Sequence, residues 1–141
     1  MQSYTLEFTP YSVICREGDP SSDLFFLQSG KLLICTIHGT EVKALARIEP
    51  GEFIGELSFF DSKPRSTHIV ALEQSTLLQI PKQELAGKLP LWYLETGKAL
   101  TKKIRKLDQV VQETKIRKSG AEESRPLSID DQRILYDLLT R

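Results

Sequence analysis

Apolar and polar positions form short blocks separated by turn residues along the first 80 positions of the chain. The block from Asp23 to Leu27 is typical of a buried strand, and the turn at 28–31 predicts a hairpin with a strand at 32–37. Further strands are expected at 42–48 and 75–80. Strands thus recur about every 8–12 residues, with glycine or proline turns between them. This spacing predicts a mainly β fold, either a β-sandwich or a jelly roll.

The apolar spacing changes to a helical period after residue 80. Pro81 opens a short helix that is predicted to continue to Leu85. A long helix is predicted over 91–118, where apolar residues follow a heptad seam that extends backward through Gly97 and Tyr93. The seam residues at four-three-four spacing are Leu100, Ile104, Leu107, Val111 and Thr114. Residues 91–100 can pack on their own domain, whereas the rest of the helix extends beyond what a small β-roll could cover.

The end of the chain contains one more predicted helix, Ile129 to Leu139, with Ser128 as its N-cap. A flexible linker, residues 119–126, precedes it. Its apolar stripe supports two interpretations: a helix that docks back on the roll, or one that docks a partner or begins a truncated effector domain. The patterns divide the chain into four parts, a roll at 1–90, the long helix at 91–118, the linker at 119–126 and a C-terminal segment at 127–141.

Candidate chemistry lies between Gly51 and Ala71. Gly55 lets a ligand approach the backbone closely, and the amides that follow can point donors at an anion. Glu56 is an acceptor when ionised and suits sugar hydroxyls, while Arg65 offers a planar fork that matches a phosphate. A carboxylate and a guanidinium nine residues apart across a turn are the pattern of a nucleotide-monophosphate site. An exposed salt bridge between Glu56 and Arg65 explains the same pair equally well.

Composition narrows the classes of function. Of the 141 residues, 40% are apolar and 27% charged, with a formal net charge of zero, which argues against a broadly basic nucleic-acid surface. No apolar run approaches the roughly 20 residues that span a bilayer, so a cytoplasmic protein is expected. Cys15 and Cys35 are interpreted as reduced strand residues. His38 and His68 lack the neighbouring ligands that a metal site needs, and no metal is expected.

Residues 51–71 resemble the phosphate-binding segment of the cyclic nucleotide-binding domain, the module of catabolite activators and of cAMP-dependent kinase regulatory subunits. The matching positions are Ile54, Gly55, Glu56, Leu57, Ser58, Arg65, Ser66, Ile69 and Ala71. Two positions depart from the family pattern: Phe59 replaces an aliphatic residue and Thr67 replaces alanine. A second family signature runs from Ile14 to Gly30. The resemblance covers roughly residues 5–115 and implies a β-roll of jelly-roll type (a double-stranded β-helix) followed by a long dimerisation helix.

The resemblance implies a sensor that binds a 3′,5′-cyclic nucleotide without turnover. The implied ligand is cAMP, with cGMP left open, and a homodimer would form through the long helix. Its implied ligand-binding residues are Gly55, Glu56, Leu57, Ser58, Arg65, Ser66 and Thr67, with base contacts from Lys103, Leu107 and Asp108. Its implied dimer interface is Leu100, Ile104, Leu107 and Val111.

Several other functions are disfavoured by the sequence. Only about 15 residues follow the linker, too few for a helix-turn-helix module, so direct DNA binding is not expected. No arrangement of nucleophile, base and acid is placed convincingly, and no enzymatic activity is expected. The output would pass to a protein effector through the C-terminal segment. The alternative is a constitutive scaffold protein that retains the roll but does not use its nucleotide site.

Overall fold

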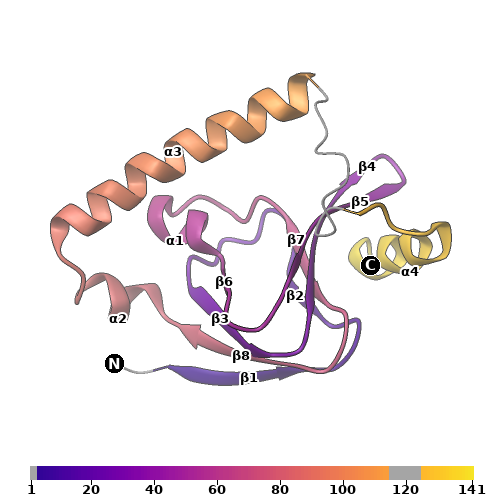
Figure 1. The fold of residues 1–141 in the computed structure, drawn as a ribbon, viewed down its shortest axis with the longest axis horizontal. Helices are drawn as coiled ribbons and strands as arrows, with labels where there is room; N and C mark the ends of the chain where they lie inside the picture. Colours follow the sequence, from indigo (N-terminus) through magenta and orange to yellow (C-terminus); the bar gives the residue numbers. More distant parts are fainter. Residues whose placement is uncertain (1–2, 115–124) are drawn as a thin grey trace.

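The structure is a computed structural model that describes residues 3–114 and 125–141, with side chains given for 3–110 and 125–141. Its strands in the described part are β1 (Tyr4–Phe8), β2 (Val13–Cys15), β3 (Leu24–Ser29), β4 (Leu32–His38), β5 (Glu41–Ile48), β6 (Phe53–Ile54), β7 (His68–Ala71) and β8 (Ser75–Ile80). The helices are α1 (Glu56–Asp61), α2 (Lys82–Ala86), α3 (Leu91–Thr114) and α4 (Ile129–Leu139). The strands form two antiparallel sheets, ordered β1-β8-β3-β6 and β2-β7-β4-β5 (Figure 1). The predicted mainly β roll with C-terminal helices is confirmed.

The predicted hairpin of residues 23–37 is wrong, although both of its strands exist. β3 pairs with β6 and β8, whereas β4 pairs with β5 and β7 in the other sheet. The turn between them therefore carries the chain from one sheet to the next. Gly30 permits this corner because its φ is +102° and a Cβ there would lie 2.6 Å from the Cα of Ser75.

Two apolar clusters stabilise the roll, one on each side of the β4-containing sheet. The inner cluster joins the facing sides of the two sheets, with Leu27 from one sheet and Leu32 from the other, both 0% exposed. The outer cluster contains Leu33, Cys35, Val42 and Val70 together with two residues of α4, Leu135 and Leu139. Both cysteines are free and buried, and burial raises the pKa of Cys15 to about 11 and of Cys35 to about 12.

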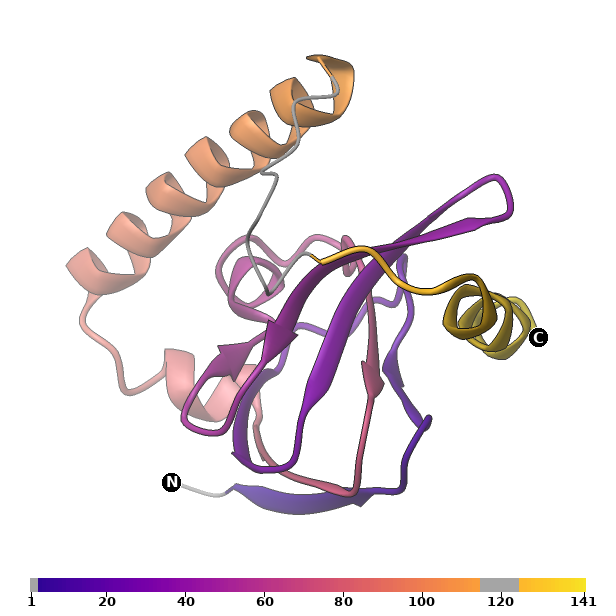
Figure 2. The ribbon, with the colours of Figure 1, turned by 45° about the vertical axis from the view of Figure 1, so that its right-hand side comes forward.

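α4 docks back on the roll, the first of the two interpretations of the last helix. It lies on the outer side of β4 and β5 (Figure 2). Ser128 is the N-cap, as expected, and its side chain accepts a 3.1 Å hydrogen bond from the Asp131 amide. Leu135 is 1% exposed and Leu139 5%, so these two residues of the apolar stripe are covered by the chain's own sheet, whereas Ile134 is 49% exposed.

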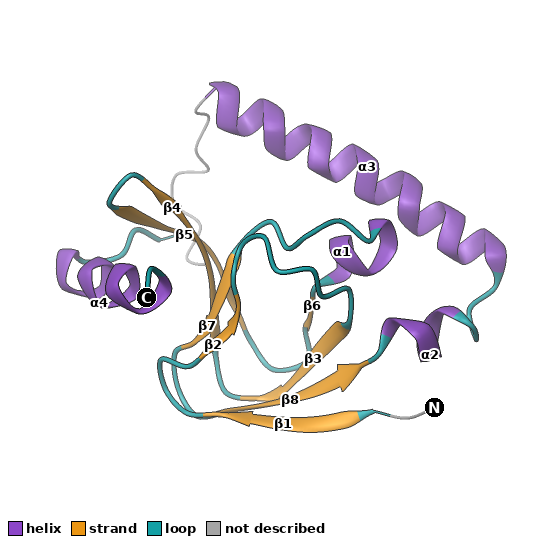
Figure 3. Ribbon diagram, turned by 180° about the vertical axis from the view of Figure 1, so that it is seen from behind, coloured by secondary structure: helices purple, strands orange, loops and turns teal. Residues whose placement is uncertain are grey.

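The sequence predicts no helix between Gly55 and Arg65, where the structure has α1. The short helix is too brief for a period of 3.6 to be visible in the sequence. α3 lies across α1 and apart from both sheets (Figures 1 and 3). The predicted helical residues 115–118 and linker residues 119–124 lie outside the described residues. Within the described part, no helix is long and apolar enough to cross a membrane.

Candidate functional site

The Arg65 side chain is the centre of the candidate site. It is 5% exposed, and its guanidinium packs over the Phe25 ring at 5.7 Å. Nη1 donates to the Gly55 carbonyl at 3.1 Å. Nη2 donates to the Asp23 carbonyl at 2.6 Å and to the Ser21 hydroxyl at 3.3 Å, while the buried Nε has no partner. A buried cation is thus held by neutral oxygens, and its Nε donor is unused.

The backbone around Arg65 is fixed on both sides. Its amide donates to the Asp19 carbonyl at 2.8 Å, and its own carbonyl accepts the Gly18 amide at 2.8 Å. The Asp23 carboxylate, beside the carbonyl that holds the guanidinium, accepts the Lys82 amide at 2.9 Å. The arginine is therefore positioned by a loop that is itself anchored to the start of α2.

Gly55 is required for this arrangement. Its φ is +86°, a region that side chains rarely adopt, and it precedes the first turn of α1. A Cβ here would lie 2.5 Å from Arg65 Nη1 and 3.0 Å from the Asp23 carbonyl oxygen. α1 has no side-chain cap, so its first amides, those of Glu56, Leu57 and Ser58, have no capping side chain as a partner.

The sequence offered a salt bridge between Glu56 and Arg65 as the alternative to a nucleotide site. This salt bridge does not form. Arg65 makes no ion pair with any carboxylate of the described residues, and the Glu56 side chain is exposed as a whole. Partial burial of the Glu56 carboxyl nonetheless raises its pKa, opposed by a hydrogen bond to its own amide and reinforced by Glu52. The carboxylate is therefore available to accept from a ligand.

The two hydroxyl residues after Arg65 differ in exposure. Ser66 is exposed, and Thr67 is half-buried, with its carbonyl 3.9 Å from the Cys15 thiol. Ser58, in α1, is 3% exposed and Leu57 is half-buried. The structure therefore brings together Gly55, the amides of α1 and Arg65, with the hydroxyl of Ser66 open to solvent.

The predicted base contacts on α3 are not brought to this site. Lys103, Leu107 and Asp108 are exposed, and no hydrogen bond or ion pair joins the two charged residues to positions 55–67 in the described part. α3 instead holds α1 through Arg105, whose Nε and Nη2 form a bidentate ion pair with Asp61. The sequence carried no signal for this pair, because its members stand 44 residues apart.

The predicted seam on α3 is partly exposed and partly used within the chain. Leu100, Ile104 and Leu107 are 53%, 43% and 63% exposed, and the Val111 side chain lies outside the described part. Gly97 faces α1, since a Cβ on it would lie 2.1 Å from a ring carbon of Phe60. Gly97 therefore packs within the chain, as the alternative for residues 91–100 expected.

A groove of about 610 Å³ lies apart from Arg65. It is lined by residues of α1, α2 and α3 and of the turn after α1, and neither Glu56 nor Arg65 lines it. Among the described residues, no group of three or more His, Cys, Asp or Glu side chains could hold a metal ion. The chemistry of the Gly55–Arg65 site is thus that of anion binding: burial lowers the pKa of the Arg65 guanidinium, and an anion beside it would compensate for lost water.

Comparison with known proteins identifies the fold around this site. The family model for the cyclic nucleotide-binding domain matches residues 5–89, more than half of the chain. The cyclic AMP receptor protein of Thermus thermophilus is 32% identical over 96 residues, 65% of this chain and 44% of that protein. A cAMP-dependent protein kinase regulatory subunit of Colletotrichum orbiculare is 31% identical over 86 residues, 59% of this chain and 22% of that protein.

A solved structure agrees with these relatives. The cAMP-bound form of an EAL enzyme is 26% identical, with a TM-score of 0.65 over 79% of this chain and 32% of that one. The chain spans less than half the length of the relatives named here. The residues matched by the family model include Gly55, Glu56 and Arg65. The chain belongs to the cyclic nucleotide-binding domain family.

Proposed function

We propose that the chain is a sensor that binds cAMP between the start of α1 and Arg65. The observation that carries this proposal is the buried Arg65 guanidinium, which is held by two carbonyls and a hydroxyl and has an unpartnered Nε. A buried cation without a carboxylate is costly, and a phosphate at this position offsets that cost through charge-assisted hydrogen bonds.

The other residues of the site each contact a different part of the ligand. The amides at the start of α1, from Glu56 to Ser58, cradle the cyclic phosphate together with the hydroxyl of Ser66. Glu56 accepts a hydrogen bond from the ribose 2′-hydroxyl, and Thr67 adjoins the phosphate. This division is supported by the positive φ of Gly55 and by the absence of a side-chain cap on α1. No bond of the ligand is broken, because these groups orient phosphate and ribose and supply no base.

Two observations support cAMP. The receptor and the kinase subunit named above are both described by cAMP. The EAL enzyme has been solved with cAMP and also with cGMP, so cGMP is the second ligand to test. Ser66 and Thr67 offer hydroxyls compatible with either nucleotide.

Signal transmission is proposed to run from α1 to α3. α3 rests on α1 through the Arg105–Asp61 pair and the Gly97–Phe60 contact, so a shift of α1 moves the longer helix. We infer that two copies pair through Leu100, Ile104, Leu107 and Val111, and that base contacts come from Lys103, Leu107 and Asp108 once α3 has moved. The new position of α3 would then be detected by a protein effector.

Isothermal titration tests the ligand and the site together. Nucleotide-free protein, prepared by unfolding and refolding, is titrated with cAMP and then with cGMP. Loss of the Arg65 fork should weaken binding by roughly ten- to a hundredfold or more in Arg65→Ala. Arg133→Ala is the matched control, since this arginine is exposed on α4 and leaves the site intact.

The thermal stability of each variant separates loss of the site from loss of the fold. Arg65→Lys adds a second comparison, because it keeps the charge but removes the planar fork. Unchanged cAMP affinity in a folded Arg65→Ala protein would refute the site. If the wild-type protein binds neither nucleotide, the proposal fails and the scaffold alternative takes its place.

A further inference from the structure

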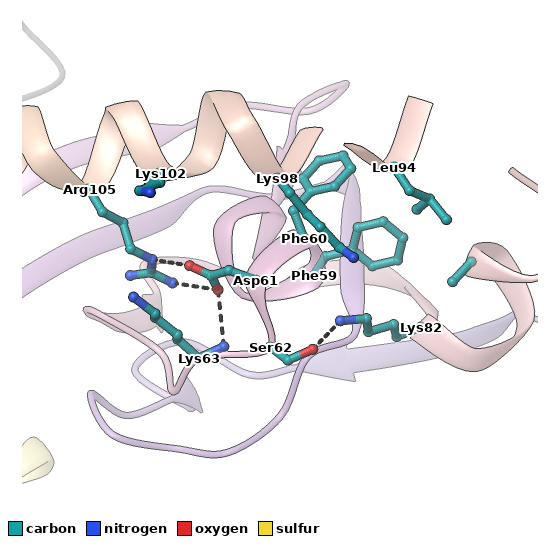
Figure 4. Close-up of a pocket in the computed structure, with 11 residues that line it drawn as sticks. Phe59, Phe60, Asp61, Ser62, Lys63, Lys82, Leu94, Lys98, Lys102 and Arg105 are labelled. Atoms are coloured by element: carbon teal, nitrogen blue, oxygen red, sulfur yellow. Dashed lines mark hydrogen bonds and ion pairs between the residues drawn. The ribbon is translucent and has the colours of Figure 1, made fainter. Parts of the chain in front are cut away.

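The groove between α1, α2 and α3 is strongly basic. Its charged lining consists of five cations, Lys63, Lys82, Lys98, Lys102 and Arg105, and one acid, Asp61. Its apolar lining is formed by Phe59, Phe60, Ala86 and Leu94. These residues come from all three helices and from the turn after α1, so the charge is gathered by the fold and not by one run of sequence (Figure 4).

The single acid of the groove is already occupied. Asp61 accepts the bidentate pair from Arg105 and also the Lys63 amide at 3.0 Å, and the hydrogen bond from Arg105 helps lower its pKa. Among the described residues, none of the four lysines forms an ion pair with a buried carboxylate. Lys98 pairs at 3.6 Å with Glu95, but both side chains are more than half exposed and water screens such a pair.

Lys82 shows the effect of this imbalance most clearly. Its ammonium lies 6.0 Å from the centre of the Phe59 ring and donates to the Ser62 hydroxyl. Burial lowers the pKa of Lys82 and repulsion from Lys98 lowers it further, and the attraction of Asp61 opposes this shift without cancelling it. Lys82 and Lys98 point toward the same part of the groove (Figure 4). An anion placed between them would reduce the repulsion of the two ammonium groups.

We propose that this groove binds a small molecule carrying phosphate groups beside an apolar or aromatic ring, at a site separate from Arg65. Its volume of about 610 Å³ lies within the usual range for small-molecule sites, roughly 300–1,000 Å³. The lysines match the phosphates and the Phe60–Leu94 side matches the ring. This site goes beyond the proposed nucleotide sensor, and it does not depend on it.

Occupation of the groove would act on the same helix as the nucleotide. The start of α1 lies at Gly55 and Arg65, whereas its end, Asp61, forms one wall of the groove. A ligand held between Lys82 of α2 and Lys98 or Lys102 of α3 draws these helices together over α1. The second ligand therefore changes nucleotide affinity through α1 and the helices around it.

Calorimetric titration of the full chain with two probes, phenyl phosphate and inorganic phosphate, tests the site. Both should bind, phenyl phosphate more tightly, because only it covers the apolar side. Lys82→Ala and Lys102→Glu should each weaken phenyl phosphate roughly tenfold. Lys106→Glu is the matched control, an exposed lysine of the same helix that does not line the groove. Arg65→Ala should weaken probe binding far less than Lys82→Ala does, because Arg65 does not line the groove, and this difference separates the groove from the nucleotide site.

Each contrary result overturns the proposal. If neither probe binds at millimolar concentration, the groove is not a phosphate site. An equal loss in Lys106→Glu and Lys102→Glu means diffuse attraction to a basic surface. A loss in Arg65→Ala as large as the loss in Lys82→Ala places the probe at the nucleotide site instead. Binding of an acidic peptide such as oligoglutamate, without binding of either probe, assigns the groove to a protein partner.

Discussion

Replacing Gly55 by alanine should destabilise the protein and displace Arg65 at the same time. The φ of +86° costs an alanine about 1–2 kcal/mol. The new Cβ would stand 2.5 Å from Arg65 Nη1, so the guanidinium must leave its 3.1 Å hydrogen bond to the Gly55 carbonyl. A hydrogen bond from a charged group contributes about 1.5–3 kcal/mol. Together these effects predict a loss of about 2.5–5 kcal/mol in the free energy of unfolding.

Gly51→Ala separates the two effects. Gly51 has a similar φ of +95°, but a Cβ there would meet nothing within 4 Å. This variant should therefore lose only the strain, about 1–2 kcal/mol. Urea unfolding followed by far-ultraviolet circular dichroism measures both variants. The single tryptophan, Trp92, is a poor reporter because it is 70% exposed.

Calorimetric titration with cAMP completes the comparison. Gly51→Ala should bind as the wild type does, whereas Gly55→Ala should lose most of its affinity because its arginine is displaced. Equal stabilities and equal affinities of the two variants would refute the reasoning, since they would show that the Gly55–Arg65 contact matters no more than a strained turn.

Three further predictions concern the rest of the chain. Leu135→Ala should cost about 2–5 kcal/mol in urea unfolding because it opens a cavity under α4, while Ile134→Ala, 49% exposed, should change stability little. Burial lowers the pKa of His68 below its usual 6.5, so the unfolded chain binds more protons and stability should fall as the pH drops below about 6.5. Urea unfolding at neutral and at mildly acidic pH measures this dependence of stability on pH, and His68→Gln should remove it. An unchanged dependence in the variant would contradict the assignment to His68. Leu107→Glu should convert a dimer to a monomer in sedimentation experiments, and an all-monomer wild type would exclude the proposed pairing.

The sequence located the strands, but it did not show how they pair or which backbone groups hold Arg65. Apolar blocks bounded by turn residues located β4 and β8, because burial of both faces requires such blocks. Turn residues do not reveal whether the next strand pairs locally or crosses to another sheet, and the predicted hairpin at 23–37 failed for that reason. The oxygens that hold Arg65 include the backbone carbonyls of Gly55 and Asp23, and a carbonyl has no signature in a sequence.

Contacts between distant segments were equally hidden. The Arg105–Asp61 pair joins residues 44 apart, and the heptad pattern of α3 pointed to a partner helix rather than to α1. Gly97 was assigned to that seam because its position fits the repeat. In the structure it allows the Phe60 ring to approach the helix. A period therefore identified a helix with an apolar side, but could not say which neighbour each residue of that side contacts.

α1 explains why the two proposed sites belong to one mechanism. α1 is a helix of six residues, and it is positioned by the contacts at its two ends and by the buried Phe59 between them. Gly55 and Arg65 hold its first residue, whereas Arg105 and the groove hold its last. An anion bound at one end of α1 therefore changes the binding free energy of the ligand at the other end. By linkage, the two changes are equal. The affinity for cAMP measured with phenyl phosphate must therefore differ from the affinity measured without it, and an unchanged affinity would refute the connection.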